Sequence, residues 1–219
     1  MDSKLCQKYA KALLHIGVNL QKGETVLLQT CTEGLQLAKE VTKQAFEMGA
    51  KDVVVHIEDA EINHLRALHC DEATLKEVPA WKLESVDFVL RDGNAVQIGI
   101  MSSYPTLNND VDTAKLLAQG FASNEVRNVV RKYIHAGTLK WVGTVCPSMN
   151  WAKQLYPELS DEEASKFAKL YLSDGNCNLF AHVLICLHNS TPVGLSPTAI
   201  KALAFVVASK YICGIIPTS

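Results

Sequence analysis

Two short, largely apolar segments flank an amphipathic one near the start of the chain. Thr25–Leu28 and Val53–Ile57 have the pattern of buried strands. Between them, apolar residues recur at the spacing of a helix: Leu37, Ala38, Val41, Ala45 and Met48. We expect Thr30 and Glu33 to form a capping box before this helix and Gly49 to end it. A connection that carries its own helix is too long for a hairpin, so the two strands should be parallel, with a right-handed crossover.

Two further strands are predicted downstream. Ala95 to Met101 is one, and Lys140 to Cys146 is the other, where Pro147 stops the run because proline cannot donate to a β-ladder. Strands and helices alternate from Thr25 to Leu172. This order predicts an α/β layered domain with a mainly parallel sheet covered by helices, and it leaves the strand order open.

Glycine, proline and short polar residues mark the expected helix ends. The opening helix has an apolar stripe formed by Leu5, Tyr9, Ala12, Leu13 and Ile16, and we expect Gly17 to be its left-handed cap. Short helices should follow Glu58-Asp59 and Asp71. Pro79 suits the first turn of a helix that runs through Leu90 and ends at Asp92-Gly93.

The second half continues in the same way. A long helix should begin at Asn109-Asp110, break near Gly120 and end at Gly137. A short helix is expected over 150–157. Ser160–Glu163 reads as a second capping box, opening a helix to about Leu172.

Composition narrows the class of protein. At 219 residues and 48% hydrophobic, the chain is long enough for one good core of its own, or for one domain plus a fragment of another. A net charge of -2 provides no broad basic field, which argues against nucleic acid or a membrane surface as partner. Seven cysteines without repeated spacing suit reduced thiols, and Met1–Lys4 leads into no apolar signal segment. We therefore expect a cytoplasmic protein.

One local group of side chains could hold a divalent ion. It follows the second strand and consists of His56, Glu58, Asp59, Glu61 and His64, at the end of the sheet where α/β proteins usually bind ligands. The competing interpretation is that Asp59 or Glu58 caps the next helix and the remaining side chains are solvated. We favour the cap.

The turn after the first strand has two candidate chemistries. Cys31 lies between a strand and a helix, where a helix dipole can lower a thiol pKa, but Glu33 beside it opposes this effect. Thr30–Gly34 could cradle phosphate, yet it lacks both the dinucleotide glycine fingerprint and the P-loop ending. An ordinary buried thiol in a structural turn is the favoured interpretation.

The tail and the tryptophans offer weaker candidates. Zinc-capable side chains occur at Cys177, His182, Cys186 and His188, but their spacing matches no usual zinc pattern. The apolar stretch 199–216 contains Lys201 and Lys210, which disfavours a membrane span. Trp81, Trp141 and Trp151 suit a core or a domain interface better than a substrate groove, and Trp151 is the one expected at an interface.

Several segments resemble a known family when taken together in order. They are Tyr9–Leu14, Gly17–Glu24, Gly49–Val55, Pro79–Trp81, Trp141–Pro147, Trp151–Lys153 and Tyr156–Ala164. Over about residues 5–166 the chain resembles the aminopeptidase T / aminopeptidase S family of metalloaminopeptidases, the thermophilic metalloproteases. The resemblance implies an N-terminal α/β domain followed by a larger domain. In that second domain Glu, His and Asp side chains hold a pair of divalent metal ions of the zinc or cobalt type.

The resemblance stops soon after Lys166. No metal-binding position of the family has a counterpart here, so no catalytic, metal or substrate-binding residue is carried over and we expect this chain not to bind the metal pair. We expect an N-terminal domain over residues 1–172. Residues 173–219 form a divergent tail, which we interpret as the result of truncation, altered splicing or a shifted reading frame.

These observations lead to three hypotheses about function. The first is the N-terminal portion of a metal-dependent aminopeptidase, which releases N-terminal amino acids from peptides and is inactive as this chain alone. The second is a non-catalytic interaction or dimerisation module that pairs with a full-length paralogue or with itself. The third is a Rossmann-like domain that binds a small molecule. Peptide is the substrate expected for the full-length family, and a homodimer is compatible with the sequence.

Overall fold

Four strands form one parallel sheet in the computed structural model, which describes residues 3–102, 107–146 and 148–166. The strands are β1 Thr25–Cys31, β2 Asp52–Glu58, β3 Ala95–Met101 and β4 Lys140–Val145. Their order is β2-β1-β3-β4, and each neighbouring pair is parallel. The predicted α/β class and parallel sheet are therefore confirmed, and the third strand has the predicted bounds.

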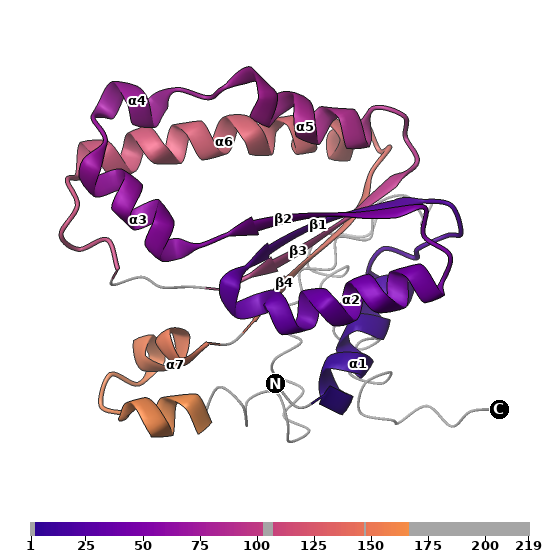
Figure 1. Cartoon of the computed structure of the whole chain (residues 1–219), viewed down its shortest axis with the longest axis horizontal. Coiled ribbons are helices and arrows are strands. Elements are labelled where there is room, and N and C mark those ends of the chain that lie inside the picture. Colours follow the sequence, from indigo (N-terminus) through magenta and orange to yellow (C-terminus); the bar gives the residue numbers. More distant parts are fainter. Residues whose placement is uncertain (1–2, 103–106, 147, 167–219) are drawn as a thin grey trace, which may run out of the picture.

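Helices cover both faces of this sheet (Figure 1). The first face carries α1 Ser3–Ala12, the π-turn η1 Leu13–Gly17 and α2 Leu35–Glu47. The second carries α5 Ala80–Leu90 and α6 Thr113–His135, with α3 Ala60–His69 and α4 Glu72–Lys76 against α6. After β4 comes α7 Met149–Leu155, and residues 161–166 are helical. The chain changes face because the crossovers from β1 to β2 and from β2 to β3 run in opposite directions across the sheet.

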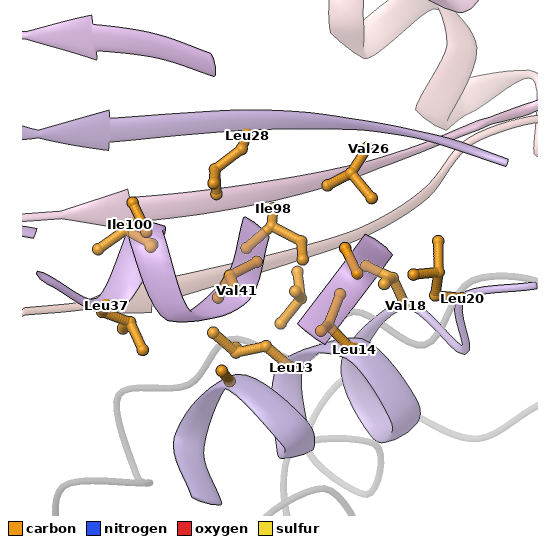
Figure 2. Close-up of a cluster of buried hydrophobic side chains, with 14 of the residues drawn as sticks. Leu13, Leu14, Val18, Leu20, Val26, Leu28, Leu37, Val41, Ile98 and Ile100 are labelled. Atoms are coloured by element: carbon orange, nitrogen blue, oxygen red, sulfur yellow. The ribbon is translucent and has the colours of Figure 1, made fainter. Parts of the chain in front are cut away.

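The larger core lies between the first face and its helices (Figure 2). Strand alternation points Leu28 and Ile98 toward this side, while the helical period brings Leu14, Leu37 and Val41 to meet them. All five side chains are fully buried. A smaller core on the second face contains Leu27, Ala95, Val86, Leu90, Val130 and Leu139.

The first predicted capping box is wrong. Thr30 is still within β1, is 4% exposed, and donates its hydroxyl to the Cys31 carbonyl at 3.3 Å. A 3-10 turn, η2 Thr32–Gly34, intervenes, and α2 has Gly34 as its N-cap without a side-chain cap. Strand β1 extends beyond its apolar segment, because the Thr30 side chain is buried in the protein interior. At the other end Gly49 has φ +86, as expected for a helix stop.

Gly17 does not have the predicted left-handed conformation. The left-handed residue is Asn19, with φ 44, and Gly17 ends the π-turn. A Cβ on Gly17 would lie 3.0 to 3.2 Å from the side chain of Val142 on β4. Close packing against a distant strand, rather than a helix cap, therefore requires the glycine.

The long helix also differs from its predicted bounds. Its N-cap is Asp112, whose Oδ1 accepts from the Ala114 N–H at 2.7 Å, so Asn109-Asp110 lies in the preceding turn. The helix continues through Gly120 without the expected break. A single glycine costs only about 1 kcal/mol there, which a helix of 23 residues tolerates.

Two other caps were predicted correctly. Asp71 accepts from the Thr74 N–H at 2.7 Å. The predicted position of Pro79 was off by one residue: it precedes α5 as its N-cap and does not occupy the first turn. Ser160 and Glu163 form the reciprocal box, with bonds of 3.3 and 3.0 Å to each other's backbone N–H. The expected end of that helix at Leu172 lies outside the described residues.

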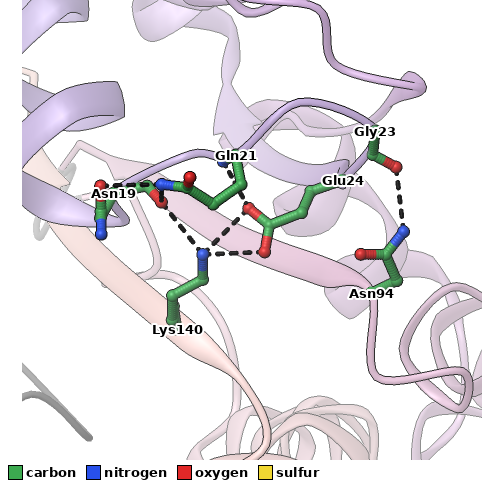
Figure 3. A network of polar contacts seen from close by, with 6 residues as sticks. All are labelled: Asn19, Gln21, Gly23, Glu24, Asn94 and Lys140. Carbon is green, nitrogen blue, oxygen red and sulfur yellow. Dashed lines mark hydrogen bonds and ion pairs between the residues drawn. The ribbon is translucent and has the colours of Figure 1, made fainter.

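A polar network ties the sheet together at its amino end (Figure 3). The Lys140 ammonium donates to both oxygens of Glu24, at 2.8 and 2.9 Å, and to the Asn19 carbonyl at 3.0 Å. Glu24 directly precedes β1 while Lys140 begins β4, and β3 lies between these strands. The network therefore connects two strands that share no backbone hydrogen bonds.

Candidate functional site

The carboxyl end of the sheet is the first place to look for a site. Open parallel sheets usually bind ligands where two neighbouring strands send their chains to opposite faces. Here β1 leads to the first face and β3 toward the second, so this position lies between Cys31 and Met101.

The turn after β1 fills much of this position with its own atoms. A Cβ on Gly34 would lie 2.6 Å from Thr30 Oγ1 and 2.7 Å from Ile100 Cγ2, so the turn is pressed onto β3. The Cys146 thiol contacts the Glu33 carbonyl at 3.4 Å. Glycine at this position thus serves close packing, and the structure supports the structural interpretation of Thr30–Gly34 over a phosphate cradle.

Cys31 is not activated as a nucleophile. Burial raises its pKa to about 11, an effect that the Gly34 backbone N–H only partly offsets, while the Glu33 carboxylate raises the pKa further. Burial likewise raises the pKa of Cys146 to about 12. Both thiols are therefore protonated at neutral pH, whereas the thiolate is the reactive form.

Asp59 joins the ends of β1 and β2. Its Oδ2 accepts from the Thr32 hydroxyl at 2.6 Å, and its Oδ1 accepts from the Ile62 N–H at 3.0 Å as the N-cap of α3. The hydrogen bond from Thr32, followed by that from Ile62, holds the pKa of this carboxyl below its usual value. The favoured interpretation of Asp59 as a cap is confirmed.

The other members of the predicted metal group point elsewhere. His64 is held by the chain before α6: its Nδ1 lies 3.2 Å from Asn108 Oδ1 and its Nε2 3.5 Å from Asp110 Oδ2. His56 is within β2, opposite Gln29, on the sheet face that carries Leu27. Across the described parts of the chain, no group of three or more His, Cys, Asp or Glu side chains is arranged to hold a metal ion. These side chains therefore do not fit the metal pair that the family resemblance implies.

The second sheet face carries polar side chains toward its carboxyl half. The Gln97 amide donates to Gln29 Oε1 at 2.8 Å, and beyond this pair Gly99 lies opposite Gly143 on β4. A Cβ on Gly99 would meet only the Val142 carbonyl, at 3.9 Å, so packing does not require a glycine there. Toward its carboxyl end, this face therefore has the partly exposed amides of Gln29 and Gln97 and two glycines without side chains in place of an apolar core.

Trp141 borders this polar area. Its ring lies 3.9 Å from the position of a Cβ on Gly143, and its indole Nε1 is buried without a hydrogen-bond partner among the described residues. Such a donor is satisfied only when an acceptor reaches it. A core or interface position was expected for Trp141, whereas Gln29 and Gln97 were not predicted. The signal in the sequence was that each of these glutamines stands beside apolar residues in a strand.

The remaining candidates give no site. Trp81 is 67% exposed on α5, with the Lys82 ammonium 5.6 Å from the centre of its ring, so it is neither a core residue nor part of a described groove. The side chain of Trp151, the proposed zinc-capable residues 177–188 and the apolar stretch 199–216 lie outside what the structure describes. No helix in the described ranges is both long and apolar enough to cross a membrane.

A groove between α1 and α2 is lined by side chains of both signs. Lys8 and Lys11 on α1 face Glu40 and Glu47 on α2, and Lys43 lies 3.9 Å from Glu47. Exposed ion pairs of this kind contribute little and select no particular ligand. The groove is best described as a solvated boundary between two helices.

Comparison with known proteins finds a family and several relatives that match this chain. The thermophilic metalloprotease (M29) family matches residues 2–172. Aminopeptidase PepS of Streptococcus thermophilus is 33% identical over 159 residues, which are 72% of this chain and 38% of PepS. Aminopeptidase AmpS of Bacillus subtilis is 29% identical over 162 residues, which are 74% of this chain and 39% of AmpS.

A solved structure has the same fold. Wild-type AmpT from Thermus thermophilus matches with a TM-score of 0.71 at 20% identity, over 83% of this chain and 46% of AmpT. The chain thus spans less than half the length of these relatives.

Proposed function

The chain belongs to the thermophilic metalloprotease (M29) family, and from this we propose that it is the N-terminal portion of a metal-dependent aminopeptidase, an enzyme that releases N-terminal amino acids from peptides. The observation that carries this proposal is the match to curated aminopeptidases over 72% to 74% of the chain. The matched segment is an α/β domain, and the proposed domain is 1–172, with 173–219 as a divergent tail.

In this proposal the chemistry belongs to the part of the relatives that this chain does not span. Hydrolysis by a metal pair needs several convergent carboxylate and imidazole ligands, a bridging water with a lowered pKa and an open position for the substrate. Two of the side chains at the carboxyl end of the sheet already have structural roles: Asp59 caps α3, and His64 contacts Asp110 in the chain before α6. No step of hydrolysis is therefore assigned to them, and we propose that the chain alone is inactive.

The test is an aminopeptidase assay on the purified 219-residue chain. Hydrolysis of aminoacyl-nitroanilides is measured with added zinc or cobalt, with full-length Aminopeptidase PepS of Streptococcus thermophilus as the positive control. We expect turnover by PepS and none by this chain. Hydrolysis by the chain that a chelator abolishes would contradict the proposed inactivity, while the family membership would stand.

A non-catalytic interaction module is the second candidate. The polar area around Gln29 and Gln97 includes the buried Trp141 indole, which has no hydrogen-bond partner among the described residues, and we take this area to suit contact with another protein surface. Polar side chains that lie beside apolar ones are typical of interfaces between domains. The area therefore suits an interface. Its partner would be another domain in the enzyme hypothesis and another protein in the interaction-module hypothesis.

A further inference from the structure

One side of the strand β2 has no neighbour among the described strands, because β2 is last in the strand order. Its seven residues pair with β1 in unbroken register. Residues 52–58 contain no proline or lysine, which proteins usually place on an open edge to prevent pairing. The open side of these residues, called the β2 edge below, can therefore take up a further strand.

The pairing with β1 identifies the backbone groups on the β2 edge. Thr25 begins β1 and donates its N–H to the Asn94 carbonyl beside β3, so the next residue of β1 points its backbone groups toward β2. That residue is aligned with Val53, and in a parallel pair it bonds to the two residues that flank its partner. Val53 therefore points its own backbone groups outward. Those of Val55 and Ile57 do the same, because backbone direction alternates along a strand.

One face of the β2 edge is apolar. Val53 packs onto the core on the α2 side, so by strand alternation Val55 and Ile57 lie on that same face. Val55 is 40% exposed and Ile57 is 56% exposed. Helix α2, which covers this face, adds Phe46 at 50%. A strand added here buries apolar side chains at every second position, which stabilises the pair.

The other face of the β2 edge has a carboxylate at each end. Asp52 begins the strand and Glu58 ends it, with Val54 and His56 between them on this face, and both acidic side chains are exposed. Asp52 Oδ1 now accepts from the outward Val53 N–H at 2.8 Å. An added strand takes over that donor and leaves the carboxylate for a basic side chain. Opposite charges directly across a strand pair stabilise it, so this face selects basic residues at both ends of the added strand.

We propose that the β2 edge binds an extended segment of another protein, in which apolar residues alternate with polar ones and a basic residue stands at each end. The segment lies antiparallel to β2, which is the more stable pairing. Its apolar residues form hydrogen-bonded pairs with Val53, Val55 and Ile57, and its basic residues lie opposite Asp52 and Glu58. Main-chain hydrogen bonds supply the affinity of such a complex, and the alternating side chains supply its specificity.

The experiment measures the binding of a synthetic peptide to the full chain by fluorescence anisotropy. The probe is acetyl-Lys-Val-Thr-Val-Thr-Val-Lys-amide, labelled at its carboxyl end. Its blocked amino end makes it unsuitable for the release of N-terminal amino acids, so the outcome is independent of the proposed peptidase function. We expect a dissociation constant on the order of 100 μM, because a short flexible peptide loses conformational freedom on binding.

Two altered peptides separate the contributions of backbone and charge. A methyl group on the nitrogen of the central valine removes the donor to Val55 and keeps every side chain, and it should weaken binding by at least about tenfold. Glutamate in place of both lysines sets like charges opposite Asp52 and Glu58, and it should weaken binding by a similar factor of about ten.

A charge exchange in the protein tests the same pairs from the other side. Asp52→Lys combined with Glu58→Lys should reverse the preference, so that the glutamate peptide binds more tightly than the lysine peptide. Glu125→Lys combined with Glu158→Lys is the control, since it alters the net charge equally at exposed positions outside β2 and should keep the original preference.

A further variant tests the apolar face. Val55→Lys should abolish measurable binding, whereas Phe88→Lys, at a position 69% exposed on α5, should leave it unchanged. Far-ultraviolet circular dichroism checks that each variant is folded. The proposal is overturned if the probe does not bind, which is also the result when another part of the protein covers this edge. Equal binding of the methylated peptide, or an unchanged preference after the charge exchange, overturns it as well.

Discussion

Two glycines in this chain have opposite surroundings. Gly34 is pressed between Thr30 and Ile100, with room for no Cβ, whereas Gly120 in α6 has no atom within 4 Å of the position that a Cβ would take. Neither has a positive φ, so conformational freedom explains neither glycine. The neighbours of each position decide what a methyl group would do there.

We predict opposite effects when each glycine is replaced by alanine. Gly34→Ala should destabilise the fold by about 1–3 kcal/mol, since side chains on β1 and β3 must move aside. Gly120→Ala should stabilise it by roughly 0.5–1 kcal/mol, since alanine is the better helix former. Urea unfolding of both variants measures these changes. A Gly34→Ala variant as stable as the wild type would show that the turn is not tightly packed.

Elements meet at the carboxyl end of the sheet through Asp59. This residue directly follows β2, and its carboxylate caps α3 and accepts a hydrogen bond from the Thr32 hydroxyl in the turn after β1. It therefore holds three elements together where a ligand site was one interpretation of the sequence. Its stabilising effect depends on charge, because the ionised carboxylate accepts both hydrogen bonds.

The prediction for Asp59 is a pH-dependent loss of stability. Its folded pKa is lowered, so its contribution is fully present above the unfolded value of about 4 and is lost as the pH falls through the lower folded value. Asp59→Ala should therefore lower the urea midpoint at pH 7, and the difference from the wild type should shrink with acidification. Glu61→Ala, in the same first turn, is the control and should change the midpoint less. A constant difference at all pH values would contradict this account.

At the scale of the whole molecule, the Glu24–Lys140 network connects distant parts of the chain at the amino end of the sheet. The two residues are far apart in the sequence, and their side chains are only 13% and 33% exposed. Bonds to the Asn19 carbonyl and the Gln21 N–H complete the network. Part of the segment that carries the family resemblance, Gly17–Glu24, therefore has a structural role.

We predict that Lys140→Met destabilises the fold by about 1–3 kcal/mol, because it leaves a largely buried carboxylate without its charged donor. Glu24→Gln combined with Lys140→Met should cost less than the sum of the single changes, which denaturant unfolding in a double-mutant cycle would show. Lys43→Met is the control, since its ion pair with Glu47 is exposed on both sides and should contribute at most about 0.5 kcal/mol. Additive single effects would mean that the two side chains do not act together.

Local pattern was enough to predict most of the elements. Strands buried on both sides are apolar runs, so β3 was predicted with its observed ends, and caps such as Asp59, Asp71 and Ser160 act within three residues. The candidate site was predicted less well. His56 to His64 are close in sequence, but strand alternation and the start of α3 send them in different directions.

The sequence by itself determined the alternation of strands and helices, their parallel pairing and the family, because periodicity, caps and motif order are properties of short segments. Only the tertiary structure decided the strand order and why Gly17 and Gly34 are glycines. It also decided which polar side chains line the second face. These features depend on Val142, Ile100 and Gln97 arriving from strands tens of residues away. Contacts over such separations form only when the chain packs, and no local pattern records them.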